Sequence, residues 1–196
     1  MTIETAGVLS PLLAEYADIP IAFDVRSVLL ATQNGGNSFL LTERAVDRPY
    51  MKDYDAVSER PRDWATRFDT SQWALFLARV EGRGVGGATV ALRTSGLHML
   101  EGRTDLAVLW DIRVLPSFRG QGIGRGLFNA TEAWAMAQGC RELKVETQNV
   151  NVAACRFYAA LGCQLRLARE EAYPECPGEA QFLWYKVLPG THIAAG

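Results

Sequence analysis

The segment LAVLWDIRVLPSFRGQGIGRGLFNATEAWAMAQ, residues 106–138, constrains the fold more than any other part of the chain. Its apolar, β-branched run Leu106–Val114 predicts a buried strand, which Pro116 ends. The glycine-rich run 119–126 follows, and apolar residues then recur at the spacing of an amphipathic helix. Such a turn brings free backbone N–H groups and the positive end of a helix dipole to one place. The segment therefore predicts a site for an anion.

The spacing of the glycines indicates which anion fits. A dinucleotide-binding G-x-G-x-x-G fails because its third glycine falls on Arg125 or Leu127, and no lysine or hydroxyl residue completes a nucleoside triphosphate loop. The segment Arg119–Gly124 does fit R-x-x-G-x-G. In this form, directly after a strand, it resembles the pyrophosphate-binding motif of the GNAT superfamily of acyl-CoA-dependent N-acetyltransferases. A glycine-rich connection without a ligand is the alternative interpretation.

A second motif follows the alternating strand predicted over residues 142–147. Asn149 or Asn151 can cap a helix that ends at Gly162. One face of this helix carries Asn151, Ala154, Cys155 and Tyr158. Tyr158 by itself would be read as a core tyrosine with its hydroxyl at the surface. The whole pattern, N-x-x-A-x-x-F-Y-x-x-x-G, resembles the GNAT motif that follows the fifth strand of that fold.

The two motifs identify the chain as a member of the GNAT superfamily. The segments WDIRVLPSFRGQGIGRGL and LKVETQNVNVAACRFYAALGC further resemble the streptothricin acetyltransferases. The residues themselves predict a mixed sheet, because strands at 73–80 and 85–92 precede a βαβ unit over 106–147. The resemblance implies an α/β fold whose mostly antiparallel sheet contains a parallel, splayed strand pair and has flanking helices.

We expect a single domain over residues 1–196. Its parts are a variable N-terminal part on the acceptor side (1–72), a core (73–188) and a tail (189–196). Within the first part, residues 11–16 predict a short helix. Residues 25–31 and 38–46 predict a hairpin around Asn34-Gly35-Gly36-Asn37.

Composition narrows the remaining function classes. The chain has 196 residues, a net charge of −2 and 48% hydrophobic residues, which predicts a sizeable core and no basic surface for nucleic acid. No apolar run approaches the ~20 residues of a membrane span, and the first residues lack an apolar signal core. We therefore expect a cytoplasmic protein without membrane attachment. Two histidines, and four cysteines without C-x-x-C spacing, predict no metal site.

The resemblance implies acetyl-CoA as the cofactor and direct transfer of its acetyl group within a ternary complex. It also implies that the backbone of the strand Leu106–Val114, the glycine-rich turn and the second motif bind this cofactor. The predicted cofactor-binding residues are Ile112, Arg113, Val114, Arg119, Gly120, Gln121, Gly122, Ile123, Gly124, Arg125, Asn151, Ala154 and Tyr158.

The chemistry requires that a substrate ammonium with a pKa of ~10.4 first lose a proton. Asp111 and Glu146, near the ends of adjacent predicted strands, are the candidate bases. We expect Asp111 to influence the pH–rate profile more than Glu146; a solvated or ion-paired acid is the alternative for each. Tyr158 is the candidate acid for the departing thiolate. Cys155 has no histidine partner in its motif, which argues against a covalent acetyl-enzyme.

The acceptor side is predicted in the irregular segment over residues 47–69. Tyr50, Asp53, Tyr54 and Asp55 would line it, and the two aspartates would attract a cationic amine. A surface loop with short helical turns is the alternative there. The expected partner is a small-molecule amine such as a streptothricin-like antibiotic. Protein lysines or N-termini, polyamines, and a non-catalytic acyl-CoA sensor are the other readings. Homodimers are common in the superfamily that the chain resembles, so a homodimer is a further partner that the resemblance implies.

Overall fold

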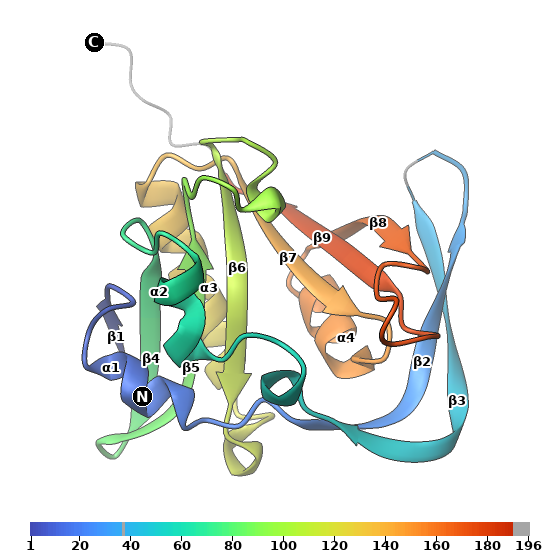
Figure 1. Ribbon diagram of the computed structural model, residues 1–196, viewed down its shortest axis with the longest axis horizontal. Coiled ribbons are helices and arrows are strands. Elements are labelled where there is room, and N and C mark those ends of the chain that lie inside the picture. Colours follow the sequence, from blue (N-terminus) through green and yellow to red (C-terminus); the bar gives the residue numbers. More distant parts are fainter. Residues whose placement is uncertain (37, 190–196) are drawn as a thin grey trace. The chain divides into compact units, whose positions relative to one another are not determined.

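The computed structural model describes residues 1–36 and 38–189 (Figure 1). Asn37 of the predicted hairpin turn and residues 190–196 of the predicted tail lie outside the described residues. The chain divides into two compact units. The first contains Met1–Ile21, Asp55–Leu143 and the residues from Val187 onward, and the second contains Ala22–Tyr54 and Lys144–Lys186.

The first unit is built on four antiparallel strands in the order β1-β4-β5-β6. They are β1 (Thr2–Ala6), β4 (Ala74–Val80), β5 (Arg83–Ala91) and β6 (Leu106–Val114). The predicted strands β4, β5 and β6 are confirmed. Strand β1 was not predicted, because its sequence TIETA lies at the sheet edge, is largely exposed and has no apolar alternation.

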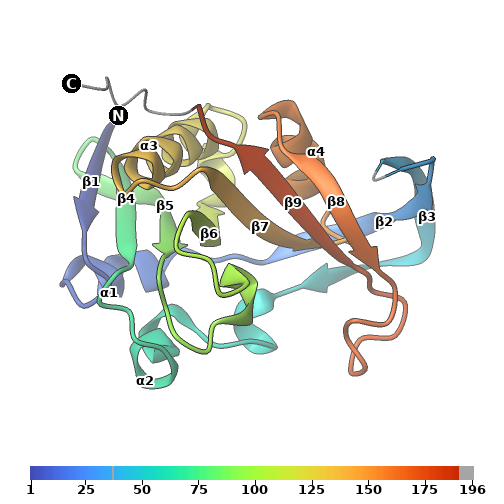
Figure 2. The ribbon, with the colours of Figure 1, turned by 90° about the horizontal axis from the view of Figure 1, so that it is seen from above.

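Two helices of this unit, α1 (Leu12–Ala17) and α3 (Ile123–Ala137), lie on opposite faces of the four strands (Figure 2). A Cβ built on Gly87 would meet the Tyr16 ring of α1, whereas one on neighbouring Gly86 would meet Ile123 of α3. Successive residues of a strand point to opposite faces of the sheet, so Gly87 faces α1 and Gly86 faces α3. Both helices begin and end close to where the sequence predicts them.

The face that carries α1 holds a core rich in aromatic side chains. Helix α2 (Trp64–Arg67) and the short 3-10 helices η1 (Tyr54–Ala56), η2 (Pro61–Asp63) and η3 (His98–Leu100) belong to the connections in this region. Trp64, which is 2% exposed, lies 6.0 Å from Tyr16 and 6.2 Å from Trp73 between ring centres. Within the segment 47–69, residues 54–67 therefore contain the short helical turns that the alternative interpretation expects, whereas residues 47–52 belong to a strand.

We predict that Gly87→Ala destabilises the protein by about 2–3 kcal/mol, the usual cost of overpacking a core. The new Cβ would lie 2.4 Å from Cδ2 of Tyr16 and 2.7 Å from the backbone oxygen of Phe76, and neither can move freely. Thermal unfolding should show a Tm about 5–10 °C lower. Gly7→Ala is the matched control, since a Cβ there would have nothing within 4 Å. Equal Tm values for the two variants would contradict the prediction.

The second strand of the predicted βαβ unit is β7 (Glu142–Gln148), and its first residues lie beside the start of β6. In the first unit, the Asp105 carbonyl accepts hydrogen bonds from the N–H groups of Arg141 at 2.7 Å and Glu142 at 3.3 Å. β6 and β7 therefore start side by side, as strands of a parallel pair do.

The second unit contains the antiparallel hairpin of β2 (Phe23–Gln33) and β3 (Phe39–Lys52). It also contains three strands in the order β7-β9-β8, with β8 (Gln164–Arg169) and β9 (Gln181–Val187), and helix α4 (Val152–Ala160). Asn149 joins these parts: its backbone oxygen accepts from Leu29 N–H at 3.0 Å, and its side chain donates to the Leu29 carbonyl at 3.2 Å.

Strand β3 is longer than predicted. Residues 47–52 were assigned to the irregular segment because DRPYMK lacks periodicity, yet they continue the strand. Tyr50 and Lys52 pair with Val25 and Phe23 of β2 beyond an irregularity in register.

Among the helices of residues 1–36 and 38–189, none has the length and apolar character needed to cross a membrane.

Candidate functional site

The glycine-rich turn lies in the first unit between the 3-10 helix η4 (Pro116–Phe118) and α3. Gly120 and Gly122 have φ angles of 76° and 84°, a left-handed conformation that residues with a Cβ rarely adopt. The first hydrogen bond of α3 runs from Gly126 N–H to the Gly122 carbonyl at 2.9 Å. The N–H groups of residues 123–125 therefore precede the helical ladder and have no helical acceptor.

This set of donors fits the phosphates of a nucleotide-containing cofactor. A Cβ on Gly120 or Gly122 would have no heavy atom within 4 Å, so the space beside the turn is open. The side chains of Arg119 and Gln121 each donate to a backbone carbonyl at 3.0 Å and so brace the turn. Backbone N–H groups at the positive end of a helix are complementary to a pyrophosphate.

Strand β6, which leads into this turn, contains a β-bulge at Trp110. Thr89 of β5 lies opposite Asp111, whereas the next residue, Val90, lies opposite Leu109. Trp110 is therefore an extra residue on β6.

The bulge changes which side chains face α1. Before it, Val108 and Trp110 pack in the core on the α1 side. After it, Asp111 and Arg113 both contact Tyr16 of α1. Strict alternation would have placed Asp111 and Arg113 on the α3 side, so the extra residue brings these two polar side chains under α1.

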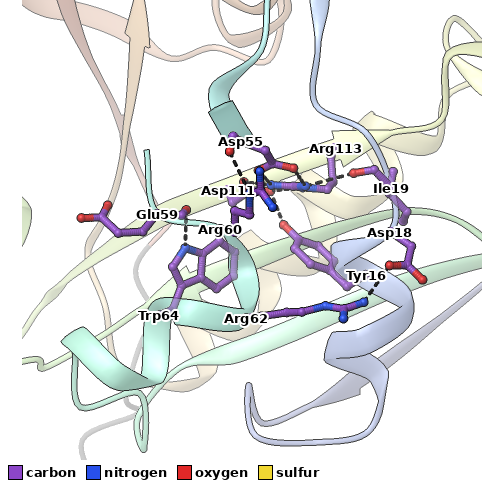
Figure 3. A network of polar contacts seen from close by, with 10 residues as sticks. All are labelled: Tyr16, Asp18, Ile19, Asp55, Glu59, Arg60, Arg62, Trp64, Asp111 and Arg113. Carbon is purple, nitrogen blue, oxygen red and sulfur yellow. Dashed lines mark hydrogen bonds and ion pairs between the residues drawn. The ribbon is translucent and has the colours of Figure 1, made fainter. Parts of the chain in front are cut away.

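Arg113 is the centre of a buried polar network on this face (Figure 3). Its side chain is 1% exposed. The guanidinium donates to Asp111 at 2.9 and 2.7 Å, to Asp55 at 2.9 and 3.1 Å, and to the Ile19 carbonyl at 3.0 Å. These acceptors use all five N–H donors of the arginine. The Tyr16 hydroxyl donates to Asp111, and the Arg113 Cζ lies 5.2 Å from the centre of the Tyr16 ring.

The protonation states in this network are well defined. Burial raises the pKa of Tyr16 well above its usual range, and the charge of Asp111 raises it further. Burial alone would lower the pKa of Arg113, but the hydrogen bonds and charge of Asp111 outweigh that effect and raise it. The phenol therefore stays neutral and the guanidinium stays charged between its two carboxylates.

The network alters the expected roles of the two aspartates. Asp111 lies within β6, and both of its oxygens already accept hydrogen bonds from Arg113. Asp55 was expected to attract a cationic amine. In the structure it forms a two-pronged ion pair with Arg113, so its carboxylate already has a cationic partner within the fold. Neither Tyr16 nor the side chain of Arg113 was assigned this role, since no local spacing connects α1 to β6.

In the second unit, helix α4 presents the second motif. Asn151 caps it as predicted, with its side-chain oxygen accepting from the Ala154 N–H at 3.1 Å. Cys155 and Tyr158 are 1% and 3% exposed. Burial raises the pKa of Cys155 to about 11. Its thiol is therefore protonated near neutral pH and is a poor nucleophile.

Glu146 lies on β7 and is held by two neutral donors. The Tyr173 hydroxyl donates to one of its oxygens at 2.5 Å, and the Gln181 amide donates to the other at 2.8 Å. Burial and the nearby charge of Glu146 raise the pKa of Tyr173, so this phenol stays neutral. Tyr173 and Gln181 were not predicted as site residues, because they are distant in sequence from both motifs.

The predicted acceptor residues of the second unit have different surroundings. Tyr50 on β3 is 42% exposed, and Asp53 follows β3 and is partly buried. The Tyr54 hydroxyl lies 3.5 Å from the side-chain nitrogen of Asn151, and its ring lies 5.4 Å from that of Phe23. Burial raises the pKa of Tyr54, so it too is neutral. Tyr54 thus links the acceptor segment to the cap of α4.

A buried ion pair in the same unit was missed by sequence reasoning. Lys52 and Glu179 are each 8% exposed, and the lysine nitrogen lies 2.8 and 3.0 Å from the carboxylate oxygens. The pair connects the end of β3 to the segment before β9. Their separation in sequence leaves no local signal for it.

The chain is similar in sequence to several known proteins. The model of the Acetyltransferase (GNAT) family matches residues 40–163. An aminoglycoside N(6')-acetyltransferase type 1 of Salmonella typhimurium is 32% identical over 89 residues, which span 45% of this chain and 61% of that protein. A streptothricin acetyltransferase of Escherichia coli is 28% identical over 182 residues, 91% of this chain and 93% of that protein.

A structural comparison confirms the predicted fold. A Bacillus anthracis protein crystallised with acetyl coenzyme A has a TM-score of 0.75 at 20% identity, covering 95% of this chain and 99% of that chain. The family model spans more than half of the sequence, including both motifs. The chain belongs to the acetyltransferase (GNAT) family.

Proposed function

We propose that this protein transfers the acetyl group of acetyl-CoA to a primary amine of a small cationic substrate. The observation that carries the proposal is the set of N–H groups at residues 123–125, which have no acceptor within helix α3 and follow the bulged strand β6 in the segment matched by the family model. The B. anthracis relative was crystallised with acetyl coenzyme A, and other relatives are named for acetylating aminoglycosides and streptothricin.

Acetyl-CoA would supply an activated thioester. The N–H groups of residues 123–125 would bind its pyrophosphate. The backbone of residues 112–114 would bind the pantetheine arm as an added strand. Asn151 and Ala154 on α4 are further cofactor-binding residues that the resemblance implies.

Glu146 is the better candidate for the base that removes the proton from the substrate ammonium. If Asp111 took up a proton, it would break the ion pair with buried Arg113 and leave a charge without its partner. Within residues 1–36 and 38–189, the groups that donate hydrogen bonds to Glu146 are the neutral side chains of Tyr173 and Gln181, so its protonation breaks no ion pair among these residues. Asp111 is accordingly proposed as a structural partner of Arg113.

We predict that Tyr158→Phe slows acetyl transfer only about tenfold, because a thiolate with a pKa of ~8.5 is already a fair leaving group. Phenylalanine keeps the buried ring and removes only the hydroxyl that would protonate the sulfur. Single-turnover kinetics should show the slower step with an unchanged Kd for acetyl-CoA. Tyr185→Phe, a buried tyrosine on β9, is the matched control. An unchanged rate in Tyr158→Phe would remove this residue from the mechanism.

Direct transfer is proposed over a covalent acetyl-enzyme. The only cysteine on α4 is Cys155, whose raised pKa keeps it protonated. Its sulfur lies 3.3 Å from the Thr147 hydroxyl, which in turn accepts from the Trp184 indole at 2.9 Å. These contacts lock the thiol into the packing between α4 and the strands.

A thiol-release assay with a panel of amines tests the proposal. The panel contains streptothricin, an aminoglycoside, polyamines and lysine peptides, each added to protein and acetyl-CoA. Thiol release with the small cationic amines supports the proposal. Faster release with lysine peptides would replace the substrate class. Binding of acetyl-CoA without release for any amine would favour a non-catalytic sensor.

A further inference from the structure

The side chain of Arg113 connects two places where the chain passes between the units. The chain leaves the first unit after Ile21 and returns to it at Asp55, and the β2–β3 hairpin lies between these points. The guanidinium binds the carbonyl of Ile19, just before the departure, and the carboxylate of Asp55, the first residue after the return (Figure 3). One buried side chain on β6 thus joins both ends of the excursion.

The other segment that leaves the first unit, residues 144–186, has its flanking residues joined by the backbone rather than by side chains. There the Leu188 N–H donates to the Arg141 carbonyl at 2.8 Å, a backbone hydrogen bond within the first unit. The segment 22–54 is closed on itself by the β2–β3 ladder, in which Phe23 pairs with Lys52, and the Arg113 contacts attach the residues that flank this segment to β6.

We propose that Arg113 is a positioning residue that clamps the base of the segment 22–54 and thereby places the acceptor-side residues for amine binding. This inference rests on the proposed function, because it assigns the amine to that segment. Asp53 and Tyr54 immediately precede Asp55 in the chain, and Tyr50 lies shortly before them on β3. The ion pair between Asp55 and Arg113 therefore fixes the point at which these residues join the first unit.

The chemistry of the contact suits a clamp. A guanidinium binds two carboxylates in a planar, two-pronged geometry that a lysine ammonium cannot reproduce. The side chains of Arg113, Asp111 and Asp55 are 1%, 9% and 22% exposed, so salt screens the ion pairs only weakly. Asp111 binds the other side of the guanidinium and is itself held by the Tyr16 hydroxyl. These contacts fix the orientation in which the guanidinium meets Asp55.

Asp55→Asn tests the clamp, because it removes one charge and leaves the Asp111 pair in place. Hydrogen exchange should become about tenfold faster throughout residues 22–54 while β4, β5 and β6 keep their protection. The KM for the amine should rise about tenfold or more, with an unchanged KM for acetyl-CoA. Asp55→Glu, which keeps the carboxylate, should recover most of both effects.

Asp18→Asn is the matched control. Asp18 lies one residue before Ile19 and pairs with Arg62 at 2.8 Å, but its side chain is 74% exposed. We expect no change in exchange or in either KM there. Unchanged exchange in Asp55→Asn, an equal rise in both KM values, or loss of protection in β4–β6 would each overturn the clamp. Exchange needs no substrate, so a clamp in a protein that acetylates nothing is distinguishable from a transferase without a clamp.

Discussion

Gly122→Val is expected to weaken acetyl-CoA binding by about 100-fold or more. Gly122 has a φ of 84°, where a β-branched residue is strongly disfavoured, so valine would force the turn out of its conformation. The N–H groups of residues 123–125 would then point away from the pyrophosphate. Losing two charge-assisted hydrogen bonds of about 1.5–3 kcal/mol each accounts for this reduction. Isothermal titration with acetyl-CoA measures the Kd directly.

Gly139→Val separates this effect from backbone strain. Gly139 has a φ of 81°, follows the other end of α3, and a Cβ there would also have nothing within 4 Å. The two variants should lose similar stability, since both place a β-branched residue in the left-handed region. The Kd for acetyl-CoA should change only in Gly122→Val. Equal weakening in both would mean that the turn does not hold the cofactor.

Glu146→Gln should lower kcat/KM for the amine by about 10²–10⁴-fold near neutral pH, the usual contribution of a general base. Glutamine keeps the size of the side chain and can still bond to Tyr173 and Gln181, so folding should be unaffected. The deficit should shrink as the pH approaches the ~10.4 at which a substrate amine loses its proton unaided. A pH–rate profile for each variant provides the measurement.

Two further variants test whether the effect belongs specifically to Glu146. Glu142→Gln changes a glutamate of the same strand that pairs with Arg103 at 2.7 Å, and it should leave the profile unchanged. Asp111→Asn should reduce stability, because it leaves Arg113 with one carboxylate fewer, but should alter the pH dependence less than Glu146→Gln. The reverse order would return the base to Asp111.

The local elements of the fold were predictable where sequence period and end signals agree. β6, α3 and α4 begin and end within a residue or two of the prediction, because glycines, Asn151 and a clear apolar spacing mark their ends. Strand β1 and residues 47–52 of β3 carry no such pattern. Their extended structure depends on the strands with which they pair, which local sequence does not encode.

The candidate site divides in the same way. Both motifs were readable because each lies in one short segment around a helix N-terminus. The partners of Arg113 and Glu146 come from α1 and the residues after it, from the η1 turn, from the connection before β9 and from the start of β9. Ile19 and Arg113, for example, are 94 residues apart. Such contacts follow from topology. The ion pair of Asp55 was therefore not predicted, because an isolated aspartate in the sequence gives no sign of an internal guanidinium.

The extra residue at Trp110 also affects how this chain should be compared with its relatives. The face on which a residue of β6 lies depends on how many residues precede it in the strand as well as on its chemical type. If a relative lacks the additional residue, a position aligned with Asp111 by letter can lie on the opposite side of its sheet. Transfer of residue roles between such chains therefore has to count from the bulge.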